Sequence, residues 1–352
     1  MTPMGEFDLI RQHFWRVVAA RADGSGVLLG NGDDCALLAP APGTVLAVSS
    51  DMLVAGRHFL PDTDPEALGH KALAVNLSDL AAMGARPLAF TLALALPAPD
   101  AAWLHALARG LLALADVHGC ALVGGDTTAG PLTLCLTVFG EVPGGQASRR
   151  DAARVGDDVW VSGTLGDACV GLDIALGRRA PGILADPALT AHALQRLHRP
   201  TPRVALGLAL RGLIHAAADV SDGLLADLGH ILAASGVAAR LDVEALLASQ
   251  AVHAALHALP LPDVLSGVLA GGDDYELVFT AAAGRRADIL RAAEQAATPV
   301  TRIGTIVAGP PAAHPLADGA ARVQLCDARG HPYPLPPGVA LRGFDHFAAV
   351  PT

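Results

Sequence analysis

The chain of 352 residues contains a single lysine, Lys71, beside 23 arginines, 28 aspartates and 6 glutamates, and its net charge is −10. A composition with no basic stripe argues against a nucleic-acid partner, because nucleic-acid phosphates bind to clustered basic side chains. The Gly-x-x-x-x-Gly-Lys-Ser/Thr phosphate loop is absent, and so are the His-Arg-Asp loop of protein kinases and the Gly-x-Ser-x-Gly elbow of hydrolases. Any chemistry on phosphate groups must therefore use other residues.

Long hydrophobic runs are also missing, although 52% of the residues are hydrophobic. Runs such as Phe90–Leu96 and Gly110–Ala115 fall far short of the roughly 20 residues of a membrane-spanning helix. The residues up to Arg11 mix acids with arginine and have no apolar signal core. The five cysteines are widely spaced without a Cys-x-x-Cys pair, which favours reduced thiols. We therefore expect a cytoplasmic protein with no membrane segment.

Strand-like and helix-like segments alternate along the chain, which predicts an α/β (α+β) fold. A Pro-Gly-Gly turn at 143–145 and the polar, basic stretch after it predict a boundary near residue 148, between domains 1–148 and 149–352. In the first domain the expected strands are 44–50, 88–96, 121–123 and 132–142, and the expected helices are 65–84 and 100–119. In the second domain they are strands 158–162, 277–280 and 302–307, helices 167–176, 202–215 and 223–235, and a loop or irregular hairpin at 308–337.

Aspartates recur at the ends of apolar runs, each beside glycine or serine. They occur in Gly32-Asp33-Asp34, Ser49-Ser50-Asp51, Asn76-Leu77-Ser78-Asp79, Gly124-Gly125-Asp126, Asp219-Val220-Ser221-Asp222 and Gly271-Gly272-Asp273-Asp274. Carboxylates on short turns are hard oxygen ligands, which suit Mg²⁺ carrying a phosphate-rich substrate. The first hypothesis is a nucleotide enzyme that works through metal instead of lysine.

Each motif alone has a simpler interpretation. Asp79 shares a helix face with Asn76 at i, i+3, and an ion pair with Lys71 or Arg86 would satisfy it as well as a metal would. Asp222 or Ser221 would also serve as a helix N-cap.

Four further features of the sequence carry weaker signals. The acids Asp273, Asp274 and Glu276 lie within four residues, which is unfavourable unless cations or a cationic substrate neutralise them. Arg149 and Arg150 either reach a phosphate or are exposed linker charge. His253 and His257 are at i, i+4 but lack a nearby third ligand, so they are predicted to be ordinary surface or core histidines. The segment from Ser162 to Asp167 after a strand is either an anion-binding turn or a plain strand–helix connection.

Taken in order, these motifs resemble the thiamine-monophosphate kinase family. The resemblance runs from Met4 to Phe347 and adds His58-Phe59, the stretch from Lys71 to Ala85, and Gly343-Phe344-Asp345-His346-Phe347 to the aspartate motifs. It implies the two-domain fold of aminoimidazole-ribonucleotide synthetase. The N-terminal domain is a mixed sheet with helices that binds ATP and Mg²⁺ and forms a homodimer. The C-terminal α/β domain completes the ATP and substrate site.

The resemblance also implies residue roles. The metal ligands, for several Mg²⁺ ions, are Asp34, Ser49, Ser50, Asp51, Asp79, Asp126, Asp219 and Asp222. The ATP-binding residues are Gly125, Asp126, Arg150 and Ser221. The residues that bind the thiamine substrate are His58, Asp273 and Phe344. Two of these depart from the usual family pattern, because Asp273 replaces a glutamate and Phe344 a tyrosine or tryptophan.

The implied reaction is direct in-line transfer of the γ-phosphoryl group of ATP to thiamine monophosphate, giving thiamine diphosphate. No catalytic nucleophile or base is expected, since the acceptor phosphate, with a second pKa of about 6, is largely ionised at neutral pH. One alternative is another ATP-dependent enzyme of the same fold, of the selenophosphate synthetase or purine-synthesis type. The former would want a reactive cysteine ahead of the first aspartate motif, whereas Cys35 lies inside it. The other alternative is a nucleotide- or metal-binding regulator without turnover.

Overall fold

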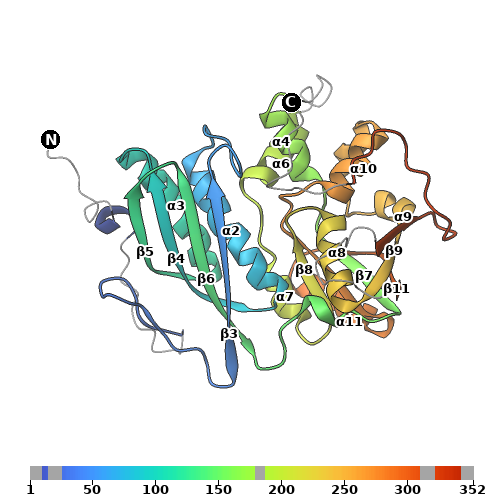
Figure 1. The fold of residues 1–352 in the computed structure, drawn as a ribbon, viewed down its shortest axis with the longest axis horizontal. Helices are drawn as coiled ribbons and strands as arrows, with labels where there is room; N and C mark the ends of the chain where they lie inside the picture. Colours follow the sequence, from blue (N-terminus) through green and yellow to red (C-terminus); the bar gives the residue numbers. More distant parts are fainter. Residues whose placement is uncertain (1–9, 15–25, 179–186, 310–321, 342–352) are drawn as a thin grey trace. The chain divides into compact units, whose positions relative to one another are not determined.

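The computed structural model describes residues 10–14, 26–178, 187–309 and 322–341. The chain forms two compact units, drawn in Figure 1. Unit 1 contains the residues up to Ala147 together with His198–Val204, and unit 2 contains Ser148–Leu197 and the residues from Ala205 onward. Each unit combines a β-sheet with helices, so the predicted two-domain α/β class is confirmed.

Unit 1 is built on a mixed sheet of four strands in the order β3-β6-β4-β5. Strands β3 (Thr44–Val54), β6 (Thr133–Pro143) and β4 (Arg86–Leu96) pair antiparallel, and β5 (Ala121–Ala129) runs parallel to β4. The predicted strands 44–50 and 121–123 are therefore too short. The extra residues place Asp51 and Asp126 inside strands, where the sequence had suggested turns after strands.

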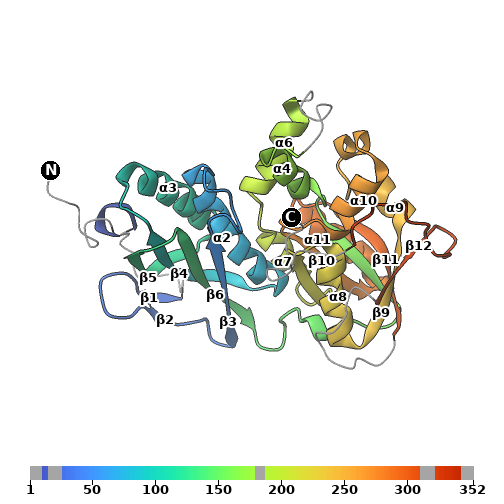
Figure 2. The ribbon, with the colours of Figure 1, turned by 45° about the horizontal axis from the view of Figure 1, so that its top comes forward.

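Helices α2 (Pro65–Ala82) and α3 (Ala101–His118) pack against each other beside this sheet (Figure 2). Each begins at an aspartate cap: Asp64 accepts the N–H of Ala67 at 2.8 Å, and Asp100 accepts two N–H groups. The helices touch backbone to backbone, because a Cβ on Gly110 would lie 1.8 Å from the carbonyl oxygen of Glu66. A short hairpin of β1 (Val27–Leu29) and β2 (Leu37–Leu38) packs within unit 1 and forms a small hydrophobic cluster around Leu88. The π-helical turn η1 (Ile10–Phe14) is also described.

Unit 2 is built on a six-stranded sheet in the order β12-β9-β11-β7-β10-β8. All neighbouring strands are antiparallel except β12 and β9. The strands are β7 (Asp157–Ser162), β8 (Ala216–Val220), β9 (Val237–Asp242), β10 (Glu276–Ala282), β11 (Val300–Ala308) and β12 (Val323–Cys326). The helices are α4 (Asp167–Ala175), α6 (Pro187–His198), α7 (Val204–Leu210), α8 (Leu224–Ser235), α9 (Val243–Ala248), α10 (Leu261–Ala270) and α11 (Arg286–Gln295), with 3₁₀ turns η2 (Arg150–Ala152), η3 (Ala254–Ala258) and η4 (Ala283–Arg285).

Three strands of unit 2, β8, β9 and β12, were not predicted. Strand β9 starts directly after Gly236, which ends α8 in the left-handed region, so no cluster of turn residues announces it. Strand β12 lies within the segment expected to be a loop or hairpin, and it joins the sheet edge by pairing with β9. The predicted helix 202–215 is shorter, because α7 spans only Val204–Leu210 and a turn separates it from β8. Within the described part of the chain, no helix combines the length and the hydrophobicity needed to cross a membrane.

Candidate active site

The first group of polar residues in unit 1 joins strand β3 to helix α2. The Ser49 hydroxyl donates a hydrogen bond to Asp79 Oδ2 at 2.5 Å, and the Asp51 N–H donates to Asn76 Oδ1 at 3.1 Å. The Asn76 amide in turn donates to the carbonyl of Ala72, one helical turn earlier, at 2.9 Å. Asn76 and Asp79 thus share a helix face, as their spacing predicts. The structure brings Ser49, Asp51 and Asp79 together, although they are distant in sequence.

One of the two alternative ion-pair partners of Asp79 is bound elsewhere. Arg86 is bound by Glu141, whose Oε1 lies 3.0 Å from the arginine Nε. Lys71 lies buried within α2, with 3% of its surface exposed. Arg86 therefore has a different carboxylate as its partner.

Ser50 is placed differently from its two neighbours in the sequence. Its hydroxyl donates to the carbonyl of Leu136 at 3.0 Å and lies 3.0 Å from the hydroxyl of Thr137, both on β6. Successive side chains of a strand point to opposite faces. The hydroxyl of Ser50 therefore does not share the site of Ser49 and Asp51.

The remaining predicted ligands of unit 1 gather near strand β5. Gly125 has φ of 152°, and a Cβ there would lie 1.9 Å from the carbonyl oxygen of Leu92, so only glycine fits. Asp126 is exposed, and its Oδ1 accepts the N–H of Thr127 at 2.9 Å. Asp34 is exposed on a turn that is tied to β5, because the amide of Asn31 donates to the carbonyl of Leu122 at 3.2 Å.

His58 lies on the turn that follows β3. Its Nδ1 accepts the N–H of Val54 at 2.9 Å. A neutral ring with an accepting Nδ1 carries its proton on Nε2. The turn therefore fixes both the orientation of this ring and its tautomer.

In unit 2, Asp219 lies near the end of β8, and the turn between β8 and α8 carries Ser221 and Asp222. A buried carboxylate that the sequence analysis missed, Asp227, holds the main chain of this turn. Its Oδ2 accepts the N–H groups of Ser221, Asp222 and Gly223 at 3.0, 3.0 and 3.1 Å. The one signal in the sequence was an aspartate in the first turn of an otherwise apolar helix, Leu224-Leu225-Ala226-Asp227-Leu228.

Asp227 is in an unusual electrostatic environment. Burial, and then the negative charges of Asp219 and Asp222, raise the pKa of Asp227 well above its ordinary value. The residue at the N-cap of α8 is Gly223, which makes no side-chain capping bond, so neither Ser221 nor Asp222 caps the helix as the simpler interpretation required. The turn therefore concentrates carboxylates on a main chain that is already fixed.

The loop that precedes β10 is attached to the same turn. The Asp273 N–H donates to the carbonyl of Ser221 at 2.8 Å, and the Tyr275 N–H donates to that of Val220 at 2.9 Å. A Cβ on Gly272 would lie 2.4 Å from the Ser221 oxygen. Asp273 and Tyr275 both adopt left-handed backbone angles, with φ of 67° and 51°. Such conformations cost roughly 1–3 kcal/mol and persist only where the surroundings enforce them.

Within this loop, the three acids have different roles. Asp273 is partly exposed, and the hydroxyl of Tyr275 donates to its Oδ1 at 3.0 Å. Asp274 and Glu276 are buried instead. Asp274 accepts the N–H of Gly166 at 2.8 Å, and Glu276 pairs with Arg196 at 2.8 Å. The acids are therefore not one cluster that needs a cationic substrate, because an internal arginine and main-chain N–H groups satisfy two of them.

Arg149 and Arg150 also differ. Arg149 is exposed and pairs with Asp151, its Nε lying 2.8 Å from Oδ1. The main chain of Arg150 is tied to α8, where the hydroxyl of Ser235 donates to the Arg150 carbonyl at 2.8 Å. Its charge acts on a group of α8: together with burial, which is the larger cause, it lowers the pKa of His230. Phe344 lies outside the described residues.

Comparison with known proteins assigns the family. Residues 32–142 match the model of the AIR synthase related protein, N-terminal domain, and residues 154–314 match that of the C-terminal domain. A thiamine-monophosphate kinase from Salmonella typhimurium is 44% identical over 345 residues, covering 98% of each chain. The chain belongs to the thiamine-monophosphate kinase family.

Solved structures agree with this assignment. The thiamine-monophosphate kinase of Stenotrophomonas maltophilia K279a has a TM-score of 0.76 and 48% identity, covering 88% of this chain and 92% of that one. AaThiL, solved in complex with AMPPCP and TMP, has a TM-score of 0.71 and 27% identity, covering 97% and 96%. The similarity to thiamine-monophosphate kinases thus spans both units and all the described aspartate motifs.

Proposed function

We propose that this protein transfers the γ-phosphoryl group of ATP to thiamine monophosphate and so forms thiamine diphosphate. The observation that carries the proposal is the similarity to thiamine-monophosphate kinases over 98% of the chain. The complex of AaThiL with AMPPCP and TMP supports the same pair of substrates. Every aspartate motif of the sequence lies within the matched length.

Mg²⁺ ions are the proposed metal, and the residues of unit 1 fit them. Ser49, Asp51 and Asp79 bring hydroxyl and carboxylate oxygens to one place, and oxygen is the ligand that Mg²⁺ prefers. Asp34 and Asp126 add exposed carboxylates near β5. We assign to Ser50 only its main-chain carbonyl, because its hydroxyl is bonded to β6. When bound, Mg²⁺ would neutralise the charge of the phosphate groups.

Unit 2 contributes a second set of groups to the proposed reaction. Asp219 and Asp222 are further metal ligands, since after burial their negative charges are the next cause of the raised pKa of Asp227, and a cation there would offset them. Ser221 and Arg150 are the ATP-binding residues of this unit, and Gly125 and Asp126 are those of unit 1. Arg150 suits a phosphate, because its guanidinium can donate two parallel hydrogen bonds to phosphate oxygens.

The proposed transfer is direct and in line, without a phosphorylated protein intermediate. The acceptor phosphate is already ionised near neutral pH, so no side chain has to remove a proton. The work of the chain is then to hold two mutually repelling phosphate groups in position. A rapid-quench experiment with γ-labelled ATP checks this: label should pass from ATP to thiamine diphosphate, and label trapped on the protein would contradict a direct transfer.

His58, Asp273 and Phe344 are the proposed contacts to the thiamine substrate. Asp273 fits this role because the main chain and the Tyr275 hydroxyl hold its partly exposed carboxylate. A fixed carboxylate favours a cationic ring. The Asp273→Asn variant should therefore raise KM for thiamine monophosphate more than KM for ATP, and an equal increase for both would contradict the placement.

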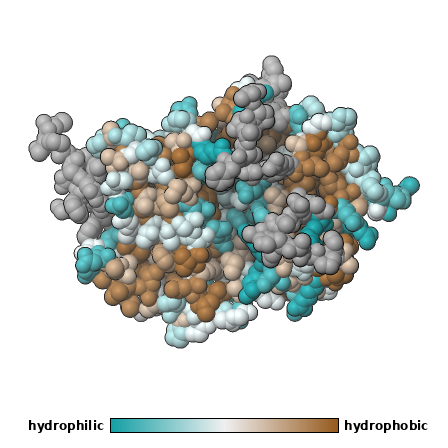
Figure 3. Space-filling model, viewed as in Figure 1, coloured by the Kyte–Doolittle hydropathy of each residue, from teal (hydrophilic) through white to brown (hydrophobic). Residues whose placement is uncertain are grey.

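A homodimer is proposed through the sheet of unit 1. On β3, Val48 and Met52 are 58% and 56% exposed, and they point to the face opposite Ser49 and Asp51. Figure 3 shows hydrophobic colour over the strands of this unit. Exposed apolar patches of this kind mark interfaces, and a second copy offers an equally apolar surface. In sedimentation experiments the wild type should be dimeric, and Val48→Asp should shift it toward monomer.

The proposed location is the cytoplasm, where ATP is available. Its reducing conditions also match the five cysteines, which are all free thiols.

Direct product detection tests the proposed function. Purified protein with Mg²⁺, ATP and thiamine monophosphate should yield thiamine diphosphate and ADP in equal amounts. An Asp79→Asn variant, which keeps the shape of the side chain but removes its charge, should lose nearly all of this yield. ADP formed only with selenide or with a purine precursor would favour another enzyme of the fold, and nucleotide binding without any turnover would favour a regulator.

A further inference from the structure

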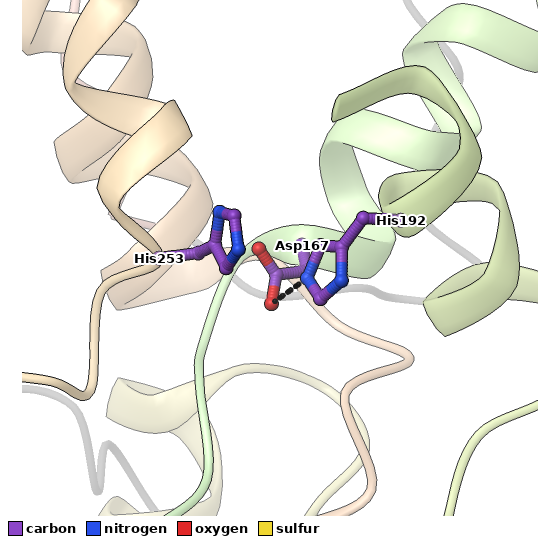
Figure 4. Close-up of side chains that lie close together, drawn as sticks. All are labelled: Asp167, His192 and His253. Carbon is purple, nitrogen blue, oxygen red and sulfur yellow. Dashed lines mark ion pairs between the residues drawn. The ribbon is translucent and has the colours of Figure 1, made fainter. Parts of the chain in front are cut away.

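Asp167, His192 and His253 lie close together in unit 2, and none of the three is assigned to the phosphoryl-transfer reaction (Figure 4). Asp167 is the first residue of α4, His192 belongs to α6, and His253 precedes η3. Their potential ligand atoms all lie within 4.8 Å of one another. The sequence pattern dismissed His253 because no third ligand stood near it. The fold supplies two from distant segments.

The carboxylate of Asp167 is buried, with its side chain 0% exposed. Its Oδ2 accepts the hydroxyl of Thr164 and lies 3.1 Å from Nε2 of His192. Its Oδ1 is buried and has no hydrogen-bond partner among the residues that the structure describes. A buried carboxylate oxygen without a partner is costly, since it has lost its hydration and received nothing in exchange. A ligand on this side of the group would remove that cost.

The two imidazoles stack, with ring centroids 4.2 Å apart and planes inclined by 19°. Both rings thus stand beside the buried carboxylate of Asp167. Imidazole nitrogen with carboxylate oxygen is a common donor set for zinc. The three side chains therefore offer such a donor set in one place.

The surroundings of Asp167 are short of positive charge. Asp274 and Glu276 are buried beside it, and the charges of Asp167 and Glu276 add to the burial that raises the pKa of Asp274. Arg196 is the buried arginine that pairs with Glu276. Among the described residues Arg196 thus serves Glu276 and not Asp167, whose buried carboxylate a divalent cation would compensate.

We propose that Asp167, His192 and His253 bind one borderline divalent transition-metal ion of the Zn²⁺ or Co²⁺ class, in addition to the Mg²⁺ ions of the reaction. Metal–ligand distances of about 2.0–2.1 Å in a tetrahedral site place neighbouring ligand atoms roughly 3.3 Å apart, close to the observed contact of Asp167 with His192. His192 is 33% exposed, which leaves a route for the ion and room for water as a fourth ligand. The ion would link α4, α6 and the segment before η3.

Titration with Co²⁺ in the presence of excess Mg²⁺ tests this proposal, because tetrahedral Co²⁺ has intense visible absorption whereas octahedral Co²⁺ absorbs weakly. The full-length wild type should gain these bands with one equivalent of Co²⁺, without the near-ultraviolet thiolate band that cysteine ligation produces. Zn²⁺ should displace the Co²⁺ and abolish the bands. Failure of the wild type to show the bands would overturn the proposal.

Single variants identify the ligands. His192→Gln and His253→Gln should each weaken Co²⁺ binding at least about tenfold. His257→Gln is the matched control, since this exposed histidine lies four residues after His253, and it should bind as the wild type does. Equal binding by all four proteins would overturn the proposal, as would loss in His257→Gln alone. Because the readout is absorption of the bound ion, the outcome does not depend on whether the protein phosphorylates thiamine monophosphate.

Discussion

The two units hold their acidic residues in different ways. In unit 1 the acids lie on long strands, a helix and an exposed turn, and side chains of neighbouring elements fix them, as Ser49 does for Asp79. In unit 2 the acids lie on a short turn whose main chain is fixed by the carboxylate of Asp227 and by the close approach of Gly272. Loss of a single contact should therefore have a small effect on the site of unit 1, whereas the turn in unit 2 should depend on the one buried carboxylate of Asp227.

Replacement of Asp227 by alanine should have the largest effect. It leaves the N–H groups of Ser221, Asp222 and Gly223 without their acceptor. Each unsatisfied buried donor costs about 1–3 kcal/mol. Because water can reach the partly exposed residues of the turn, the three costs do not add in full. We therefore expect a loss of about 3–5 kcal/mol in the free energy of unfolding. Urea unfolding measures the loss, and thiamine diphosphate formation should fall with it.

Two variants test the reason for that loss. Asp227→Asn keeps an oxygen that can accept the same hydrogen bonds, so it should retain more stability and activity than the alanine variant. Asp288→Ala is the surface control, because this half-exposed carboxylate pairs only with exposed arginines of α11 and η4 among the contacts described, and it should change stability by less than about 0.5 kcal/mol. Equal losses in Asp227→Ala and Asp288→Ala would contradict the dependence of unit 2 on the buried Asp227.

Asp274 should make stability depend on pH. Burial raises the pKa of this carboxyl well above its ordinary value. Above pH of about 4 the unfolded chain has released this proton while the folded chain still holds it, so stability is lost as pH rises, until the folded pKa is passed. The maximal slope for one group is about 1.4 kcal/mol per pH unit.

The comparison of wild type with Asp274→Asn isolates this contribution. Free energies of unfolding measured between pH 4.5 and 7, a range of about two to three units, should fall more steeply for the wild type. The asparagine variant keeps an oxygen that can accept the N–H of Gly166. Parallel curves for the two proteins would show that Asp274 is ionised in the folded state.

Arg150 and Arg149 give a smaller but sharper contrast, since they are adjacent in sequence. Arg150 acts on a group of α8, whereas Arg149 is exposed and paired with Asp151. Arg150→Ala should raise KM for ATP about tenfold, which corresponds to about 1.4 kcal/mol, and Arg149→Ala should change it less than about twofold. Similar KM values for the two variants would contradict the ATP-binding role of Arg150.

Local spacing predicted those parts of the site that lie within one element. The i, i+3 spacing correctly placed Asn76 and Asp79 on one helix face. The role of Asp227 was missed because no sequence pattern shows that a buried aspartate in a helix accepts hydrogen bonds from main-chain N–H groups. The His192–His253 contact was missed because it joins segments far apart in the chain.

The placement of Ser50 shows how strand length affects which side chains are expected to lie together. Because the strand was expected to end at Ser50, that residue was grouped with Ser49 and Asp51 at the end of the strand. The strand continues to Val54, and its alternation sends the Ser50 hydroxyl to the other face. Sequence pattern alone cannot settle this, since apolar residues are exposed on one face of β3 and the usual alternation of polar and apolar residues is lost.

Ser49 and Ser50, which point to opposite faces of β3, form the closest matched pair of variants and give the smallest predicted effect on activity. Ser49→Ala removes the hydrogen bond to Asp79. A hydrogen bond to a charged group contributes about 1.5–3 kcal/mol when both partners are buried. Because this site is partly exposed, we expect the variant to lose about 1 kcal/mol of transition-state stabilisation. That corresponds to roughly a fivefold fall in kcat/KM for ATP, with a matching increase in the Mg²⁺ concentration needed for half-maximal rate.

Ser50→Ala removes a bond to the opposite face and should change neither quantity more than about twofold. Steady-state rates over a range of Mg²⁺ concentrations separate the two, because a hydroxyl that positions Asp79 must alter the Mg²⁺ dependence and one that only joins β3 to β6 must not. If Ser50→Ala proved the more damaging variant, the face of β3 directed toward α2 would not be the one that binds the metal.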